Sequence, residues 1–91
     1  MKIVFDIETN GLLDELTKIH CICIKIIETN KTYSYHGDYA IRNILKLLSS
    51  CEEIIGHNII SFDIPAIQKV YPDFKPKAKI TDTLVLSRLI E

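Results

Sequence analysis

The sequence predicts one α/β domain with a mixed β-sheet, in the order strand, strand, strand, helix, strand, helix, strand, helix. Short runs rich in β-branched and aromatic residues, separated by turn signals, fill the first part of the chain. The hydrophobic period then changes from that of strands to that of helices. Helices and strands alternate in the remainder, which favours parallel pairing there. The length of 91 residues suits a single small domain.

The first three strands are expected at residues 2–7, 19–27 and 32–36. Asn10-Gly11 is a turn signal after the first strand, and Thr29-Asn30-Lys31 is typical of a tight connection between the next two. Strands that follow one another through short turns usually pair antiparallel. This part of the chain is therefore predicted to form a three-stranded meander.

Helical spacing begins after the third strand. Asp38 can cap a first helix, because its side chain can accept a hydrogen bond from a free backbone N–H. The apolar stripe of this helix consists of Ile41, Ile44, Leu45 and Leu48. A short strand is expected at residues 53–57. Ser61 can cap a second helix, and Pro65 is tolerated in the first turn of that helix. Its apolar stripe includes Ile64, Ile67 and Tyr71.

The chain is expected to end in a short strand at residues 79–81 and a helix at residues 83–91, with Asp82 as the cap of this helix. Helices packed on a mixed sheet follow from the element order. The last helix stops at Glu91 without a capping glycine or a turn signal. The sequence therefore predicts a C-terminally truncated, partial domain over residues 1–91.

Composition narrows the class of protein. The formal net charge is −1, which argues against a strongly basic protein that coats DNA. It does not exclude a nuclease, because metal-binding acids offset a basic surface. The three cysteines cannot all pair with one another. No signal-peptide pattern and no membrane-length apolar run is visible, so a cytoplasmic protein, in a host cell if viral, is expected.

Asp6 and Glu8 lie two residues apart at the end of the first strand. Side chains at this spacing point to the same face of a strand. Two carboxylates side by side repel each other unless solvent or cations separate them. Hard divalent cations such as Mg²⁺ prefer such oxygen ligands. A metal site and an ordinary exposed acidic strand end are both compatible with this pair.

Asp63 is the third acid of interest. It is expected in the first turn of a helix, where the helix dipole favours an acid, and an ordinary helix-start aspartate is the simpler interpretation. A strand leads into this helix through the string Gly56-His57-Asn58. If this strand pairs with the first strand, Asp63 comes close to Asp6 and Glu8.

These segments resemble a known family. Phe5-Asp6-Ile7-Glu8-Thr9, followed by Asn10-Gly11-Leu12, resembles the first motif of the DnaQ-like (DEDD) 3′→5′ exonuclease superfamily. His57-Asn58 through Phe62-Asp63 resembles its second motif, and Asp82-Thr83-Leu84 resembles a short Asp-Thr segment that often follows. The string from Asp82 to Ile90 is similar to proofreading domains of family A DNA polymerases from short-tailed bacteriophages. The resemblance covers all 91 residues.

The resemblance implies a ribonuclease H-like fold and removal of nucleotides from single-stranded DNA 3′ ends by two-metal hydrolysis with Mg²⁺ or Mn²⁺. By this likeness Asp6 bridges both metals, Glu8 binds the metal that carries the attacking water, and Asp63 holds the second metal. Whether the substrate is DNA or RNA stays open.

The likeness also implies residues that bind substrate. Thr9 and Asn58 would orient the site or the terminal nucleotide, and Leu12 and Phe62 would pack against bases. Ordinary core packing is the alternative for both Leu12 and Phe62. Asp82 is expected to cap a helix and not to bind metal. His57 does not occupy the position of the general base in this family.

One part of the family pattern is missing. The third motif, a Tyr or His followed by an Asp, has no counterpart here, and Glu91 cannot replace it. The chain therefore lacks the fourth carboxylate and the general base, and a positioned base alone is typically worth about 10²–10⁴-fold in rate.

Two functions remain in view. The first is an exonuclease domain that regains full activity with further chain, a second polymerase or exonuclease chain, or self-association. The second is a catalytically inactive module that binds nucleic acid or a replication protein. A zinc site of His20, Cys21 and Cys23 is disfavoured, because His20 points to the other side of the strand and no second ligand pair has zinc spacing.

Overall fold

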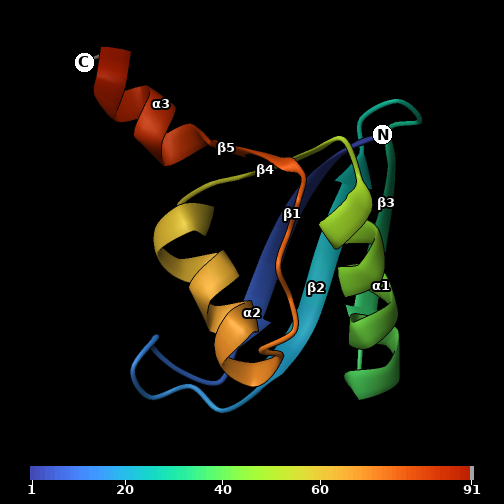
Figure 1. The fold of residues 1–91 in the computed structure, drawn as a ribbon, viewed down its shortest axis with the longest axis vertical. Coiled ribbons are helices and arrows are strands. Elements are labelled where there is room, and N and C mark those ends of the chain that lie inside the picture. Colours follow the sequence, from blue (N-terminus) through green and yellow to red (C-terminus); the bar gives the residue numbers. More distant parts are fainter. Residues whose placement is uncertain (91) are drawn as a thin grey trace.

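A five-stranded mixed sheet carries two helices on one of its faces (Figure 1). The structure is a computed structural model that describes residues 1–90, so Glu91 lies outside the described residues. In chain order the elements are β1 (Lys2–Thr9), β2 (Ile19–Ile26), β3 (Lys31–His36), α1 (Asp38–Ser50), β4 (Glu53–Gly56), the π-helical turn η1 (Ile59–Asp63), α2 (Ile64–Val70), β5 (Lys79–Asp82) and α3 (Thr83–Ile90).

The strands lie in the order β3-β2-β1-β4-β5. β1 pairs antiparallel with β2, and β2 pairs antiparallel with β3. β4 pairs parallel with β1, and β5 pairs parallel with β4. The predicted meander, the parallel second half and the mixed α/β sheet are therefore confirmed.

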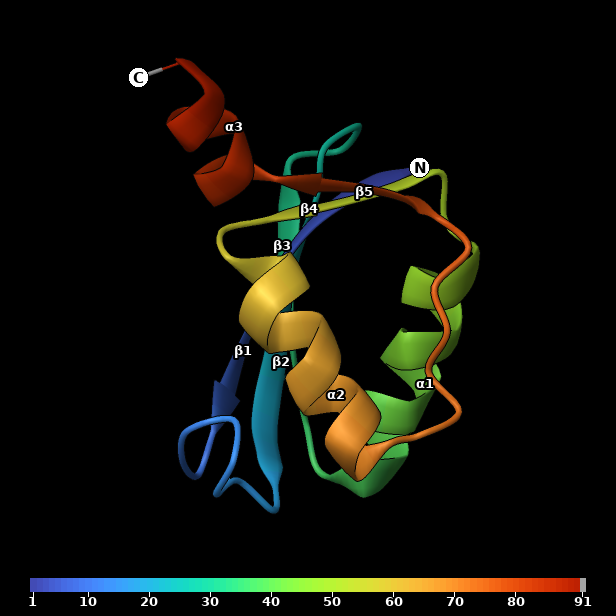
Figure 2. The same cartoon turned by 60° about the vertical axis from the view of Figure 1, so that its left-hand side comes forward.

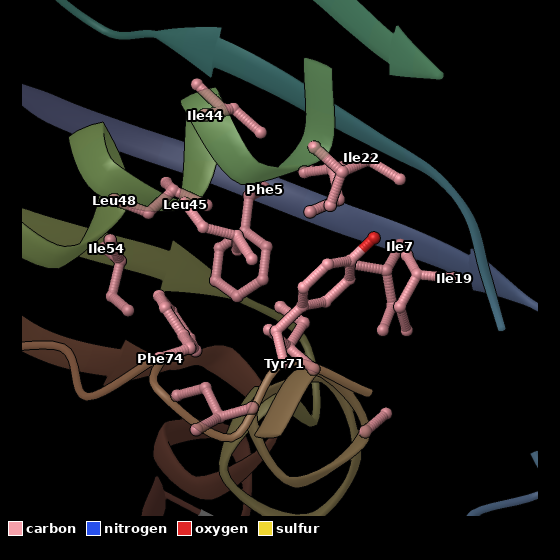
Figure 3. Close-up of a cluster of buried hydrophobic side chains, with 14 of the residues drawn as sticks. Phe5, Ile7, Ile19, Ile22, Ile44, Leu45, Leu48, Ile54, Tyr71 and Phe74 are labelled. Atoms are coloured by element: carbon pink, nitrogen blue, oxygen red, sulfur yellow. The ribbon is translucent and has the colours of Figure 1, made fainter. Parts of the chain in front are cut away.

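The hydrophobic core lies between the sheet and the two helices α1 and α2 (Figure 3). Alternate residues of β1 point into it: Ile3, Phe5 and Ile7 are buried. The predicted helix stripes meet this face, and their members Ile41, Ile44, Leu45, Leu48, Ile64, Ile67 and Tyr71 are all buried. At roughly 25 cal/mol per Å² of buried apolar surface, this contact is the main stabilising term of the fold.

The opposite face of the sheet carries the other residues of β1. Asp6 and Glu8 are exposed there, because they alternate with the buried residues of the strand. α1 and α2 both lie on the core side (Figures 1 and 2). The two acids are thus reachable from solvent.

One connection differs from the expectation. The connection from β1 to β2 is a longer loop, residues 10–18, and not a tight turn. Leu16 is fully buried and anchors this loop in the core. The carboxamide oxygen of Asn10 accepts hydrogen bonds from the backbone N–H groups of Thr17 and Lys18 at 3.0 and 3.1 Å. These contacts order a segment that has no hydrophobic period of its own.

Both predicted helix caps in the middle of the chain are wrong. Gly37, with φ 84°, occupies the N-cap of α1. Asp38 is the first helical residue instead, and its carboxylate accepts hydrogen bonds from Arg42 Nε and the Tyr71 hydroxyl. The second helical segment starts earlier than expected, as the π-helical turn at Ile59, so Ser61 lies inside the turn and caps nothing.

α3 projects from the end of β5 and away from α1 and α2 (Figures 1 and 2). Val85, Leu86 and Leu89 are exposed along it. Throughout the described chain, every helix is too short or too polar to reach across a bilayer.

Candidate metal-binding site

The end of β4 brings the second motif beside the first. β1 and β4 pair only over Lys2–Val4 and Glu53–Ile55. Beyond this point the chain leaves β4 and turns into η1, which contacts β1. Asp63 is the last residue of η1 and faces the second half of β1, where the backbone amide of Ile7 acts on its carboxylate. The predicted approach of Asp63 to β1 is therefore observed.

Asp63 is a buried acid with an unsatisfied oxygen. Its side chain is 5% exposed, and its Oδ2 has no hydrogen-bond partner among the described residues. Burial, followed by the negative charge of Asp6, raises the pKa of Asp63 to about 7, and Asp82 adds to this effect. The backbone amides of Ile7 and of Asp63 itself lower the pKa but do not offset the rise.

Glu8 and Asp6 stand on the exposed face with two cysteines opposite them. In the register of β1 and β2, Asp6 pairs with Cys23 and Glu8 pairs with Cys21. Burial, with contributions from Cys23 and then Glu8, raises the pKa of the Cys21 thiol to about 11. Cys21 is therefore a neutral thiol at physiological pH.

A divalent cation fits the chemistry of the Asp6 and Asp63 pair. The negative charge of Asp6 raises the pKa of Asp63, and a cation between the two acids would offset that repulsion. The unpaired buried carboxylate oxygen of Asp63 is a ligand without a partner. Within residues 1–90, however, no three His, Cys, Asp or Glu side chains are gathered closely enough to hold a metal. Asp6, Glu8 and Asp63 therefore do not form such a cluster in the described chain, and neither do His20, Cys21 and Cys23.

The predicted substrate-binding residues of the first motif lie at the last position of β1 and in the loop that follows. The Thr9 hydroxyl donates to the carbonyl oxygen of Gly11 at 2.7 Å, which fixes the start of this loop. Leu12 is 69% exposed. Core packing therefore does not explain Leu12, and its side chain is free to contact a ligand.

Phe62 and Asn58 belong to η1 and to the turn before it. Phe62 is half-buried and packs against the core, so part of its ring remains accessible. Asn58 has a left-handed backbone conformation, with φ 61°. Its backbone N–H donates to Asp82, and its carbonyl oxygen accepts the N–H of Phe62.

Asp82 does more than the sequence predicts. Its Oδ1 accepts the N–H of Leu84 at 2.9 Å, which confirms it as the cap of α3. The same oxygen accepts the N–H of Asn58 at 2.9 Å, and Oδ2 accepts the N–H of Ile60 at 3.0 Å. Burial alone would raise the pKa of Asp82, but the backbone N–H groups of Ile60, Asn58, Leu84 and Val85 outweigh it and lower the pKa. The Asp82-Thr83 string in the sequence indicated this position. The two additional partners of Asp82, Asn58 and Ile60, lie far away in the sequence.

Surface hollows lie away from the three candidate metal-binding acids. One, of about 430 Å³, lies between α1 and the segment after α2 and is lined by Arg42, Tyr71 and Phe74 among others. The other, of about 400 Å³, lies beside β5 and α3 and includes Ile60, Asp82 and Leu86. Neither of these two hollows is lined by Asp6, Glu8 or Asp63.

Comparison with known proteins identifies a family and relatives of this chain. The family model described as the RNase_H superfamily matches residues 3–88. A DNA-directed DNA polymerase of Enterobacteria phage T3 is 37% identical over 97% of this chain, and one of Escherichia phage T7 is 38% identical over the same share. The chain spans 14% of the length of each of these relatives.

A solved structure shares the fold. The family B DNA polymerase from the hyperthermophilic archaeon Pyrobaculum calidifontis superimposes with a TM-score of 0.60 at 16% sequence identity. The match covers 78% of this chain and 11% of that chain. At this identity the likeness supports the arrangement of strands and helices only.

Proposed function

Because this chain belongs to the RNase H superfamily, we propose that it is a metal-dependent 3′→5′ exonuclease domain of the proofreading type, acting on the 3′ ends of single-stranded DNA. Relatives that are DNA-directed DNA polymerases support this substrate class. The two acidic motifs supply the residue types that phosphodiester hydrolysis needs. The three cysteines of the described chain are free, which is typical of proteins in a reducing cytoplasm.

One observation carries the proposal: a buried carboxylate oxygen of Asp63 lacks a partner while its carboxylate lies within electrostatic range of Asp6. A purely structural aspartate would be expected to have both oxygens hydrogen-bonded, as buried polar groups nearly always are. A cation bound between the two acids would satisfy this oxygen and remove the repulsion. The pair of acids would therefore be more favourable with a bound cation than in the protein alone.

Asp6, Glu8 and Asp63 would hold Mg²⁺ or Mn²⁺, although in the described chain the three acids are not gathered closely enough to do so and would have to move together. Such ions supply an activated water and stabilise the leaving oxygen in phosphodiester hydrolysis. The chain's own residues bind and orient the substrate. Leu12 is exposed where a base could pack on it, and the half-buried ring of Phe62 offers a second apolar surface.

Thr9 and Asn58 would orient the site or the terminal nucleotide. The Thr9 hydroxyl is bound within its own loop, so its direct effect is on the loop that presents Leu12. The side chain of Asn58 stands at the turn that leads to Asp63, where an amide can donate or accept one hydrogen bond to substrate.

A fourth carboxylate and a general base would come from polypeptide other than residues 1–90. The described residues offer no Tyr or His followed by an Asp on a helix at the family's position. A further polymerase segment, a second chain or another copy of this chain could supply the pair. The chain alone would then hydrolyse DNA about 10²–10⁴-fold more slowly than a complete site.

A second candidate is a catalytically inactive module that binds nucleic acid or a replication protein. The exposed apolar residues of α3, which are Val85, Leu86 and Leu89, favour it. Apolar side chains gathered on a projecting helix are typical of a contact with another polypeptide. This function requires no intact metal site.

A nuclease assay separates the two candidates. A 5′-labelled single-stranded oligonucleotide is incubated with Mg²⁺ or Mn²⁺ and with wild type, Asp6→Ala or Asp73→Ala. Asp73 is an exposed acid in the turn after α2 and serves as the matched control. We expect slow shortening by wild type and Asp73→Ala and none by Asp6→Ala. Equal shortening by all three would point to a contaminant, and no shortening by wild type would favour the inactive module.

A further inference from the structure

The chain turns sharply between β4 and η1. A Cβ atom on Gly56 would lie 2.3 Å from Cγ2 of Ile59 and 3.0 Å from the carbonyl oxygen of Phe5. Asn58 has φ 61° and ψ 29°, a conformation that residues other than glycine adopt at a cost, and its side chain does not cap η1. Such a turn persists only where surrounding groups hold it.

Asp82 supplies that support from the neighbouring strand. Gly56 pairs with Asp82 at the ends of β4 and β5, so the carboxylate stands beside the turn. Its hydrogen bonds to Asn58 and Ile60 span 24 and 22 residues of sequence and lie on both sides of Ile59. Capping of α3 requires only the bond to Leu84. Two of the three bonds therefore serve the turn and not the helix that Asp82 caps.

Thr83 adds a second connection at the same place. Its hydroxyl donates to the carbonyl oxygen of Gly56 at 3.4 Å and lies 3.0 Å from Nδ1 of His57. The residues that begin α3 thus hold the whole segment from Gly56 to Ile60. Asp82 and Thr83 together hold the turn in place, and this pair is called the clamp below.

Asp63 is linked to this clamp by one helical turn. The N–H of Phe62 donates to the carbonyl oxygen of Asn58 at 3.0 Å. The N–H of Ile64 bonds to the carbonyl oxygen of Ile59. A displacement of Asn58 or Ile60 would therefore move the backbone of Asp63 as well. A ligand set tolerates only about 0.5 Å of such movement.

We propose that Asp82 is a positioning residue for Asp63: its carboxylate fixes the turn between β4 and η1 and thereby holds Asp63 opposite Asp6. The purpose of that placement, metal binding, rests on the proposed exonuclease function. The placement itself does not, because it follows from contacts within the protein.

Asp82→Ser separates positioning from helix capping. Serine is a good N-cap and retains an acceptor for Leu84, but one short hydroxyl cannot also serve Asn58 and Ile60. Asp82→Asn keeps the shape, removes the charge and loses one acceptor, and it is the second variant should Asp82→Ser not fold. Ile44→Val, in the core side of α1, is the control for a general loss of stability.

The first readout uses metal-free protein labelled with ¹⁵N. In Asp82→Ser we expect faster amide exchange at Asn58 and Ile60, and changed residual dipolar couplings for Phe62 and Asp63. Ile44→Val should leave these couplings unchanged. Wild-type couplings at Asp63 in both Asp82 variants would overturn the proposal, with or without a metal.

The second readout is the Mn²⁺ affinity of the folded variants, measured by electron paramagnetic resonance well below the melting temperature. We expect the Kd to rise about 10–100-fold in both Asp82 variants, as for other residues that orient metal ligands, and to stay unchanged in Ile44→Val. Unchanged affinity in the Asp82 variants would contradict the inference. If wild type binds no Mn²⁺, the proposed function fails, while the dipolar couplings still decide the placement of Asp63.

Discussion

Asp63 and Asp82 are two buried acids that interact with each other, yet their hydrogen bonding is opposite. Asp82 is 4% exposed and uses both oxygens on backbone N–H groups. Asp63 is similarly buried and leaves Oδ2 without a partner in the described chain. The pKa of Asp82 is lowered and that of Asp63 is raised. Backbone N–H groups therefore hold Asp82 as an anion within the protein, whereas the described residues leave one oxygen of Asp63 without a partner.

Asp63→Asn should make the metal-free protein more stable at pH 8. An acid whose folded pKa is raised to about 7 keeps its proton in the folded state while the unfolded state loses it above pH 4. Its contribution to the free energy of unfolding therefore falls as pH rises from about 4 to about 7. The full loss is at most about 4 kcal/mol. Urea unfolding of wild type and variant measures it.

Measuring the stability difference at two pH values separates the effect of Asp63 from that of the histidines. The stability difference between Asp63→Asn and wild type should be larger at pH 8 than at pH 4.5. Asp73→Asn is the matched control and should show no such dependence. A difference that does not change with pH would mean that Asp63 is ionised in both states.

Gly56→Ala should destabilise the protein, because the added Cβ would lie 2.3 Å from Cγ2 of Ile59. Overpacking of this kind costs about 1–3 kcal/mol. Gly11→Ala is the matched control, since its nearest neighbours would be 3.7 Å away. Denaturant unfolding should show a lower midpoint for Gly56→Ala only. Equal midpoints would show that the turn after β4 is looser than described.

Leu12→Ala should weaken binding of single-stranded DNA without changing the melting temperature, because the side chain is largely exposed. Loss of one apolar contact to a base is worth about 1 kcal/mol, or roughly fivefold in Kd. Fluorescence anisotropy with a labelled oligonucleotide measures the affinity. Leu86→Ala, on α3, is an exposed apolar control. A lower melting temperature for Leu12→Ala would instead indicate a packing role.

The cysteines should react in a fixed order. Cys23 is exposed, while Cys21 and Cys51 are buried. Burial raises the pKa of both buried thiols, that of Cys21 to about 11, so little reactive thiolate forms there at pH 8. Iodoacetamide should label Cys23 first, as read by peptide mass spectrometry. Denatured protein should lose this order, and early labelling of Cys21 would contradict the packing of β2.

The strands and the helix stripes were predictable because each depends on local spacing. Burial of Ile44 and Ile67 follows from the helical period, and the exposed pair on β1 follows from alternation along a strand. Asp38 shows the limit of local spacing. Its sequence context suits a cap, but Arg42 and Tyr71 compete for the carboxylate and Gly37 takes the cap position.

Several other contacts between distant segments were not predictable. Leu16 is a core residue in a loop without periodicity, and its burial depends on how the loop closes. The π-helical start of the second helical segment depends on Asp82, more than twenty positions away. The family resemblance marked Asp82-Thr83, but only the folded chain reveals which backbone groups they hold.

Calorimetric titration with Mn²⁺ tests the central claim most directly. Wild type and Asp73→Asn should bind the ion, while Asp6→Ala and Asp63→Asn should lose most of that affinity, because the ion would bridge these two acids. The titration is read at pH 8, where Asp63 is mostly ionised. Absence of binding in wild type, or wild-type affinity in Asp63→Asn, would contradict a metal site at this place.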